Sequence, residues 1–195
     1  VCEGAISSIH SVGGIVGHNR GVVSDCVNKA SVNGDDSWLE LESDSSLSLS
    51  LDSILHTVQE NRLNGMDIGG IAGCAVDSDI VDCVFEGSIS GHVVNCGGIA
   101  GSAEGRLNNG IYGCKNYANI TIPETNADQI GGIAGEVKQS RTNNSAAITE
   151  NCVNYGMLQG GGNTSYFGGI VGCVTGLNND AWVCKIIACA NKRSE

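Results

Sequence analysis

One five-residue phrase, Gly-Gly-Ile-x-Gly, recurs along the chain and restricts the folds that the chain can adopt. Its five copies begin at Gly13, Gly69, Gly97, Gly131 and Gly168. Glycine accounts for 29 of the 195 residues, and a glycine in a helix interior costs up to about 1 kcal/mol relative to alanine. A helical bundle is therefore excluded. Collagen is excluded too, because it needs abundant proline and the chain has one.

A second phrase follows each copy of the first. It contains a cysteine, usually with an apolar residue three positions before it and an asparagine two positions after it; the cysteines are Cys26, Cys83, Cys114, Cys152 and Cys189. The combined unit recurs about every 30 residues and has short stretches of alternating apolar and polar residues, which is typical of solenoids and propellers. We therefore predict an all-β fold. We expect an elongated β-solenoid of about five glycine-rich coils, each with about three strands, forming a single repeat domain over residues 1–195.

The repeated positions also predict the core of such a solenoid. The isoleucines of the first phrase should point inward and stack; they are Ile15, Ile71, Ile99, Ile133 and Ile170. The five cysteines of the second phrase should form a similar column. Stacked strands lie about 4.8 Å apart, whereas a disulfide needs Cβ atoms about 3.8 Å apart. We therefore expect these cysteines to be buried free thiols, and Cys96 to be another.

One segment interrupts the repeat within its first unit. Residues 33–66 contain an acidic stretch and then leucines that alternate with serine. After Asp52 and Ser53 the apolar positions change to helical spacing, and Asn64-Gly65 ends the pattern. We interpret residues 33–66 as an insertion with a strand or hairpin and one short helix. It either shields the edge of a coil or serves as a binding element.

The two phrases together resemble the GLUG repeat family, whose glycine-rich repeats occur in secreted and cell-surface proteins. That family includes adhesin-like chains and non-catalytic regions of IgA-cleaving metalloproteases. The resemblance covers all five copies and most of the chain outside the insertion. It implies an extracellular or cell-surface β-solenoid module without catalytic residues of its own.

The charge of the chain limits its partners. The formal net charge is −11, and the few lysines and arginines are scattered, so the basic stripe that a nucleic acid requires is missing. No apolar run approaches the ~20 residues that span a bilayer. We expect neither nucleic-acid binding nor membrane insertion.

Signatures of catalysis are absent from the sequence. His-Glu-x-x-His, Gly-x-Ser-x-Gly and Cys-x-x-Cys do not occur, so zincin, α/β-hydrolase and zinc-ribbon chemistry is unsupported. A carbohydrate-active enzyme on a β-helix scaffold would need clustered acids on successive coils. The candidates are Asp25, Asp82 and Glu150, which do not continue as a ladder. We therefore predict that the chain is not an enzyme.

No cofactor is expected, although calcium is a candidate. Asp77 and Asp79, and the acidic residues between Asp35 and Asp44, offer hard oxygen ligands without the spacing of a known calcium loop. Cys173 and Cys184 could form a disulfide that closes a small loop. Three sequons offer glycosylation sites if the source is eukaryotic; they are Asn119, Asn143 and Asn163.

Taken together, these features favour a non-catalytic extracellular binding or adhesive module. Its loops, at residues 35–65, 102–110 and 136–147, would contact a host or matrix protein or a glycan. A stalk or fibre segment in which identical modules assemble end to end is the alternative, and an enzyme is a more distant one. Because no signal peptide is visible at Val1, we expect the chain to be part of a longer extracellular or cell-surface protein.

Overall fold

The fold is all-β and is built from very short parallel strands. The structure is a computed structural model that describes residues 1–8, 11–34, 66–91, 93–105, 109–122, 129–139, 147–161, 165–176 and 184–192. Strands are the only regular elements in these ranges, and they form five sheets of five strands each. Within the same ranges no helix is long and apolar enough to cross a membrane.

The sheets are numbered I to V in the order in which the chain reaches them after β1. Sheet I contains β2 (Val12–Gly13), β7 (Asp67–Gly69), β12 (Asn95–Gly97), β17 (Gln129–Gly131) and β22 (Tyr166–Gly168). Sheet II contains β3 (Val16–Asn19), β8 (Ala72–Val76), β13 (Ala100–Gly105), β18 (Ala134–Gln139) and β23 (Val171–Thr175). Sheet III contains β4 (Val22–Ser24), β9 (Asp79–Val81), β14 (Gly110–Tyr112), β19 (Ile148–Glu150) and β24 (Lys185–Ile187).

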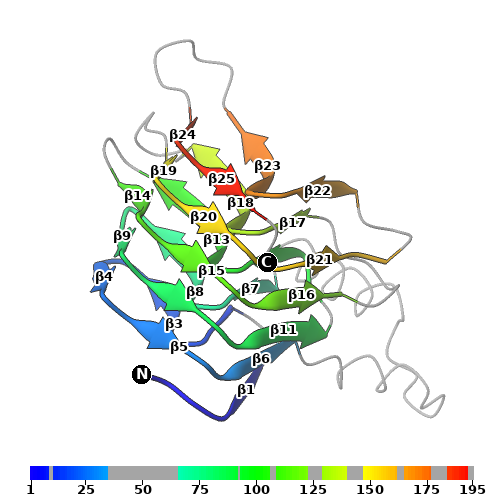
Figure 1. The fold of residues 1–195 in the computed structure, drawn as a ribbon. Helices are drawn as coiled ribbons and strands as arrows, with labels where there is room; N and C mark the ends of the chain where they lie inside the picture. Colours follow the sequence, from blue (N-terminus) through cyan, green and yellow to red (C-terminus); the bar gives the residue numbers. More distant parts are fainter. Residues whose placement is uncertain are drawn as a thin grey trace, which may run out of the picture.

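The last two sheets complete each pass of the chain. Sheet IV contains β5 (Val27–Asn28), β10 (Val84–Phe85), β15 (Lys115–Asn116), β20 (Val153–Asn154) and β25 (Ala190–Asn191). Sheet V contains β1 (Ala5–Ser8), β6 (Ser31–Gly34), β11 (Ser88–Gly91), β16 (Asn119–Thr121) and β21 (Leu158–Gln159). From β2 onward the chain visits sheets I to V in the same order on each of the first four passes, and the fifth pass runs from β22 in sheet I to β25 in sheet IV (Figure 1). Each strand pairs with its counterparts on the neighbouring passes.

This arrangement differs from the expected three strands per repeat. Each complete pass has five strands, many of only two or three residues. The cause is the brevity of the connections: residues 70–71, 82–83 and 86–87, for example, each join one strand of the second pass to the next. Closely spaced bends divide the chain into more and shorter strands than the alternation of apolar residues suggests.

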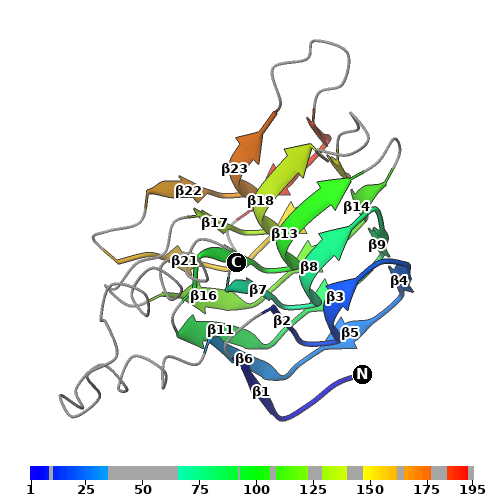
Figure 2. The same ribbon diagram turned by 180° about the vertical axis from the view of Figure 1, so that it is seen from behind.

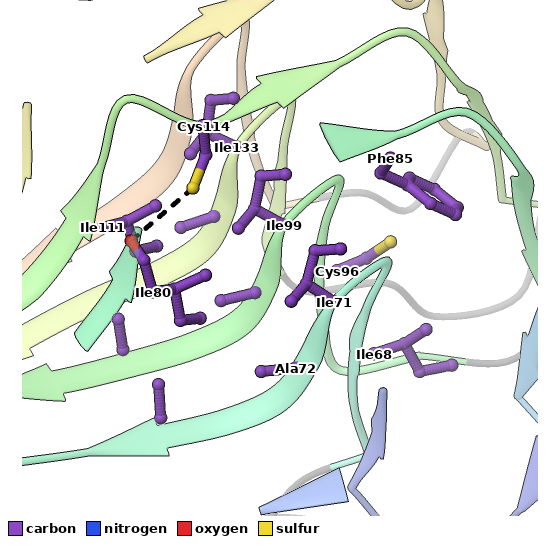
Figure 3. Packing of buried hydrophobic residues seen from close by; sticks show 14 of the residues in the cluster. Ile68, Ile71, Ala72, Ile80, Phe85, Cys96, Ile99, Ile111, Cys114 and Ile133 are labelled. Atoms are coloured by element: carbon purple, nitrogen blue, oxygen red, sulfur yellow. Dashed lines mark hydrogen bonds between the residues drawn. The ribbon is translucent and has the colours of Figure 1, made fainter. Parts of the chain in front are cut away.

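Apolar side chains of successive passes lie in register and form the core. In sheet I, Ile68, Cys96 and Ile130 are register partners, and all three are fully buried. In sheet III, Ile80 and Ile111 are partners and are also fully buried. Figure 3 shows Ile68, Cys96, Ile80 and Ile111 between the strands together with Ile71, Ile99 and Ile133.

The repeated glycines lie where passes approach each other too closely for a Cβ atom. A Cβ on Gly97 would lie 2.6 Å from the Cα of Ala134 on the next pass. A Cβ on the following residue, Gly98, would lie 2.5 Å from Nδ2 of Asn116, a buried side chain of the same pass. The Gly-Gly pair therefore reflects two different close contacts, one with backbone and one with asparagine.

Asparagines of the second phrase form a hydrogen-bonded ladder in sheet IV that is buried at Asn116 and Asn154 and exposed at Asn191. Asn116 Nδ2 donates to Asn154 Oδ1 over 2.8 Å, and Asn154 Nδ2 donates to Asn191 Oδ1 over 2.8 Å. The amides of Asn116 and Asn154 also bond the connection that follows them, as in Ala118 N donating to Asn116 Oδ1 over 3.0 Å. Phe85 takes the equivalent position in the second pass. The ladder satisfies polar groups that would otherwise be costly to bury.

The isoleucine column of the first phrase is buried in the middle and uncovered at both ends. Ile71, Ile99 and Ile133 are fully buried, whereas Ile170 is only partly buried. Ile15, which was expected inside, is 37% exposed, and that expectation is wrong for this residue. The strands on either side of Ile15, β2 and β3, are the first of sheets I and II, so no earlier strand covers them. The predicted insertion falls largely on residues 35–65, which lie outside the described residues.

Candidate functional site: the polar face of sheets I and II

The connections between strands differ in how much their length varies. The connection from sheet I to sheet II is two residues long in every pass, from residues 14–15 to residues 169–170. The connection from sheet III to sheet IV is equally constant, from residues 25–26 to residues 188–189. The connection from sheet II to sheet III instead grows from residues 20–21 to residues 176–184. The connection from sheet V to sheet I ranges from residues 92–94 to residues 35–66.

Sheets I and II therefore lie between the two connections that vary most in length. One variable connection precedes each strand of sheet I, and the other follows each strand of sheet II. Figure 2 shows the two sheets side by side on one side of the molecule. Sites that differ between proteins built on one scaffold are usually carried by connecting segments. The outward side of sheets I and II is therefore the candidate functional site.

The outward side chains of these sheets form what we call the polar face. In sheet I, Ile68 points into the core, so its strand neighbour Asp67 points outward. The outward register partners in sheet I are Asp67, Asn95, Gln129 and Tyr166. Those in sheet II are Cys74, Ser102, Glu136 and Cys173 in one row, and Glu104, Lys138 and Thr175 in the next.

Asp67 is the most deeply buried carboxylate of the polar face and joins the two sheets. It is 8% exposed, and it accepts hydrogen bonds from Asn95 Nδ2 over 2.8 Å and from Ser102 Oγ over 2.6 Å. Burial raises the pKa of the Asp67 carboxyl, and the bonds from Ser102 and Asn95 offset that rise only in part. Ser102 is itself fully buried, although its place after the glycine phrase suggests a position near solvent.

One lysine is held among the carboxylates of sheet II. Lys138 Nζ lies 3.4 Å from Glu136 Oε2 and 4.0 Å from Glu104 Oε2. Burial acts to lower the pKa of Lys138, but Glu136 and Asp67 outweigh this effect and the pKa is raised. Thr175 Oγ1 donates to Glu136 Oε1 over 3.0 Å. The lysine is thus a stable cation, and the acidic side chains around it outnumber it.

Two amide oxygens of the polar face lack a donor. Asn95 Oδ1 and Gln129 Oε1 are buried and have no hydrogen-bond partner among the described residues. Asn95 is 7% exposed, and its amide nitrogen is engaged by Asp67. Asn95 and Gln129 are register partners on adjacent strands. Buried polar atoms are nearly always paired, so two unpaired acceptors on neighbouring strands mark a place where a donor is missing.

The acids proposed for a carbohydrate-active enzyme take two kinds of position in the fold. Asp25 and Asp82 have φ values of 54° and 50°, and the equivalent residues of the other three passes, Gly113, Asn151 and Ala188, also have positive φ. Aspartate, asparagine and glycine are the residues that best tolerate this left-handed conformation. Asp25 and Asp82 therefore serve the bend before the cysteine. Glu150 belongs to another row, since it pairs with Tyr112 and Ile187.

The cysteines of the second phrase lie in one column, as expected, and differ in burial. Cys83, Cys114 and Cys152 are buried, whereas Cys26 and Cys189 at the two ends are partly exposed. Their sulfurs approach carbonyl oxygens in a repeating pattern, as in Cys114 Sγ, which lies 3.3 Å from Tyr112 O. The same sulfur lies 3.5 Å from Ile80 O (Figure 3). Cys96 is buried and free as well.

The suggested disulfide is not formed in the structure. Cys173 and Cys184 are both free. Cys173 Sγ lies 3.7 Å from Thr175 Oγ1, and Cys184 Sγ is 4.0 Å from Thr175 O. Each sulfur thus contacts Thr175, which comes two residues after Cys173 on β23, and the two sulfurs are not bonded to each other.

The remaining candidate sites were calcium ligands and sequons. Asp79 Oδ1 accepts from Asn109 Nδ2 over 3.1 Å and from Gly110 N over 3.0 Å, so it anchors the start of β14. Among the described residues, no group of three or more His, Cys, Asp or Glu is placed to hold a metal ion. Asn119 is exposed on β16, and its side chain accepts from Met157 N. Asn143, Asn163 and the acids between Asp35 and Asp44 lie outside the described residues.

Comparison with known proteins finds no matching family model, no similar curated protein and no similar solved structure. The polar face is the feature that reasoning from the sequence missed. A signal for it does exist, because Asp67, Asn95 and Gln129 are polar residues at the same place in three repeats, two positions before the Gly-Gly pair. The meaning of that pattern is clear only once the outward rows of sheet I and sheet II are known to be in contact, through the hydrogen bond from Ser102 to Asp67.

Proposed function

We propose that the chain is a non-catalytic binding module, an elongated β-solenoid of about five glycine-rich coils that acts outside the cell or at its surface. In this view each pass of the chain is one coil. The core and the two-residue connections hold the scaffold rigid. The polar face and the variable connections on either side of it contact a macromolecular partner, either a host or matrix protein or a glycan.

The observation that carries this proposal is where the length differences lie. In all passes, the connections I–II and III–IV keep two residues, while the connections on both sides of the polar face vary. Loops with variable lengths around one surface of a repeat scaffold are typical of a binding face. The resemblance to the GLUG family points the same way, since it favours an adhesin-like role at the cell surface.

A non-catalytic role agrees with the chemistry of the described residues. Asp25 and Asp82 occupy bends that need positive φ, and Asp79 bonds the start of β14. The carboxylates of the polar face are bonded to Ser102, Thr175 or Lys138.

A binding experiment with two variants tests the proposal. The protein would be applied to immobilised extracellular-matrix proteins and to a glycan array. In the first variant, residues 141–146 are replaced by glycine and serine at equal length. The second is the matched control Lys115→Ala, on the outward side of sheet IV. We expect weaker binding from the first variant alone. Absence of any binding by the native protein, or equal losses in both variants, would contradict the proposal.

End-to-end filaments in electron micrographs, together with a mass that rises with concentration in light scattering, would instead favour the stalk or fibre alternative. We expect a monomer with an elongated small-angle scattering profile.

A further inference from the structure

The unpaired hydrogen-bond acceptors of the polar face indicate which chemical groups a ligand should carry. Asn95 Oδ1 and Gln129 Oε1 are acceptors that cannot donate, and both are buried without a partner among the described residues. Asn95 cannot exchange roles by turning its amide over, because its Nδ2 donates to Asp67 Oδ1 over 2.8 Å. A ligand group that donates hydrogen bonds would satisfy these two oxygen atoms.

The charges around the two oxygens narrow the class of donor. Lys138 already pairs with Glu136 and Glu104, and no group of three or more His, Cys, Asp or Glu among the described residues is placed to hold a metal ion. Asp67, Glu136 and Glu104 repel phosphate, sulfate and carboxylate groups. A neutral donor meets no such repulsion and does not compete with Lys138 for the carboxylates. Hydroxyl groups are neutral donors that also accept, so they can bond the amide oxygens, the carboxylates and the lysine together.

We propose that the polar face binds a neutral glycan whose hydroxyl groups donate to Asn95 Oδ1 and Gln129 Oε1. This inference rests on the proposed function, since it names the ligand of the same face. Gln129 is only partly buried, and the terminal torsion of glutamine is broad. Its amide oxygen can therefore turn towards an incoming hydroxyl without a change in the backbone.

The repeat geometry suits a ligand that is itself a chain. Asp67, Asn95, Gln129 and Tyr166 occupy one register position on four successive strands of sheet I, and neighbouring strands lie about 4.8 Å apart. A row of linked sugars along these strands would meet one side chain per pass. Tyr166, which is 54% exposed, adds an aromatic surface with a polar tip at the end of the row.

The test uses a substitution that removes the acceptor and keeps the shape. Gln129→Met replaces the amide with an apolar group of similar length. Gln159→Met is the matched control, because Gln159 is exposed in sheet V. Both variants and the native protein are applied to an array of neutral, sulfated, sialylated and amine-bearing oligosaccharides. The best probe is then titrated by calorimetry.

We expect the native protein to bind neutral oligosaccharides and Gln129→Met to bind them about tenfold more weakly. Gln159→Met should bind like the native protein. Because Gln129→Met removes an unpaired buried acceptor, its thermal midpoint should be equal to or higher than that of the native protein. Weaker glycan binding therefore cannot be attributed to poorer folding.

The other outcomes separate the inference from the proposed function. Equal glycan binding by both variants and the native protein overturns this site. Binding only to charged oligosaccharides or to matrix proteins overturns the ligand class. The proposed function survives both results. Absence of binding to every glycan and every matrix protein overturns the two together.

Discussion

At the scale of single residues, Thr149 is a polar side chain in apolar surroundings. It is fully buried, and its Oγ1 has no hydrogen-bond partner among the described residues. Its register partners on the adjacent strands, Ile111 and Ile186, are apolar. Thr149→Val keeps the shape and removes the hydroxyl, so it should raise the free energy of unfolding by about 1–2 kcal/mol.

Denaturant titration measures this change. Thr121→Val, at an exposed site on β16, is the control and should alter the free energy of unfolding by less than about 0.5 kcal/mol. A loss of stability in Thr149→Val would mean that the hydroxyl is bonded in solution.

The buried carboxyl of Asp67 should make the free energy of unfolding depend on pH. Because burial raises its folded-state pKa above that of the unfolded chain, the folded protein holds the proton more tightly. Its contribution to stability is therefore greatest below the ordinary carboxyl pKa. It falls as pH rises from there through the raised pKa. Asp67→Asn should remove this component.

The measurement is the difference in unfolding free energy between the native protein and Asp67→Asn across that pH range. We expect the native protein to lose stability relative to the variant as the pH rises. A difference that does not vary with pH would contradict the burial effect.

Residues whose role follows from their place in the repeat could be predicted from sequence, as for Ile71, Ile99 and Ile133. The sequence made Asp25 and Asp82 candidates for catalytic acids because a carboxylate can act as a general acid or base. The structure gives them a backbone role, which no side-chain pattern reveals. Ile15 could not be predicted correctly either, because its exposure depends on which strands lie at the end of sheets I and II.

At the scale of elements, the connection from sheet III to sheet IV requires a left-handed residue in every pass. Four passes use aspartate, asparagine or glycine, and the fifth uses Ala188 with φ 50°. Alanine is unfavourable there by roughly 1 kcal/mol. Ala188→Gly should therefore raise the free energy of unfolding by about 0.5–1 kcal/mol.

The reverse change at the equivalent position is the control. Gly113 has φ 64°, and a Cβ there would collide with the Asp82 carboxylate. Gly113→Ala should lower the unfolding free energy. If both variants shift stability in the same direction, the conformational argument fails.

The buried cysteines give a second test at this scale. Five thiols are buried, those of Cys83, Cys96, Cys114, Cys152 and Cys184, and burial raises the pKa of Cys96. A thiol reagent must also reach the sulfur, so these five should be modified slowly in the native protein because they are buried, even though the hydrogen bond with Cys114 lowers the pKa of Cys83 to about 7. In denaturant, all ten cysteines should react. Unreactive cysteines after unfolding would show that disulfides are present.

Sequence reasoning identified the strand-rich repeat but not the number of strands. Alternation of apolar residues marks strands, yet two-residue strands such as β10 and β15 are too short to show it. Their partners on adjacent passes define them instead. The site was missed for the same reason, since the polar face is a set of contacts between repeats and not a motif within one.

At the scale of the whole molecule, the longest connection should be dispensable for the fold. Removing residues 36–64 leaves Asp35, Gly65 and Met66 between β6 and β7. Residues 92–94 make the same sheet V to sheet I connection with equal length. The shortened protein should keep its strand content and unfold cooperatively, with a change in unfolding free energy of no more than about 2 kcal/mol.

Circular dichroism and denaturant titration measure these properties. Deletion of Gly98 and Ile99, a connection of constant length, is the contrast and should abolish folding. Loss of structure after removal of residues 36–64 would place that segment in the core.

The constancy of the sheet I–II and III–IV connections makes the passes interchangeable parts. A pass copied within the gene would bring its own strands for all five sheets and would add one position to the row that contains Asn95 and Gln129. Such duplication would lengthen the proposed binding surface and leave the packing of the interior unchanged. For a polymeric ligand, each added position raises the local concentration of the next contact, so affinity can grow by the count of repeats alone.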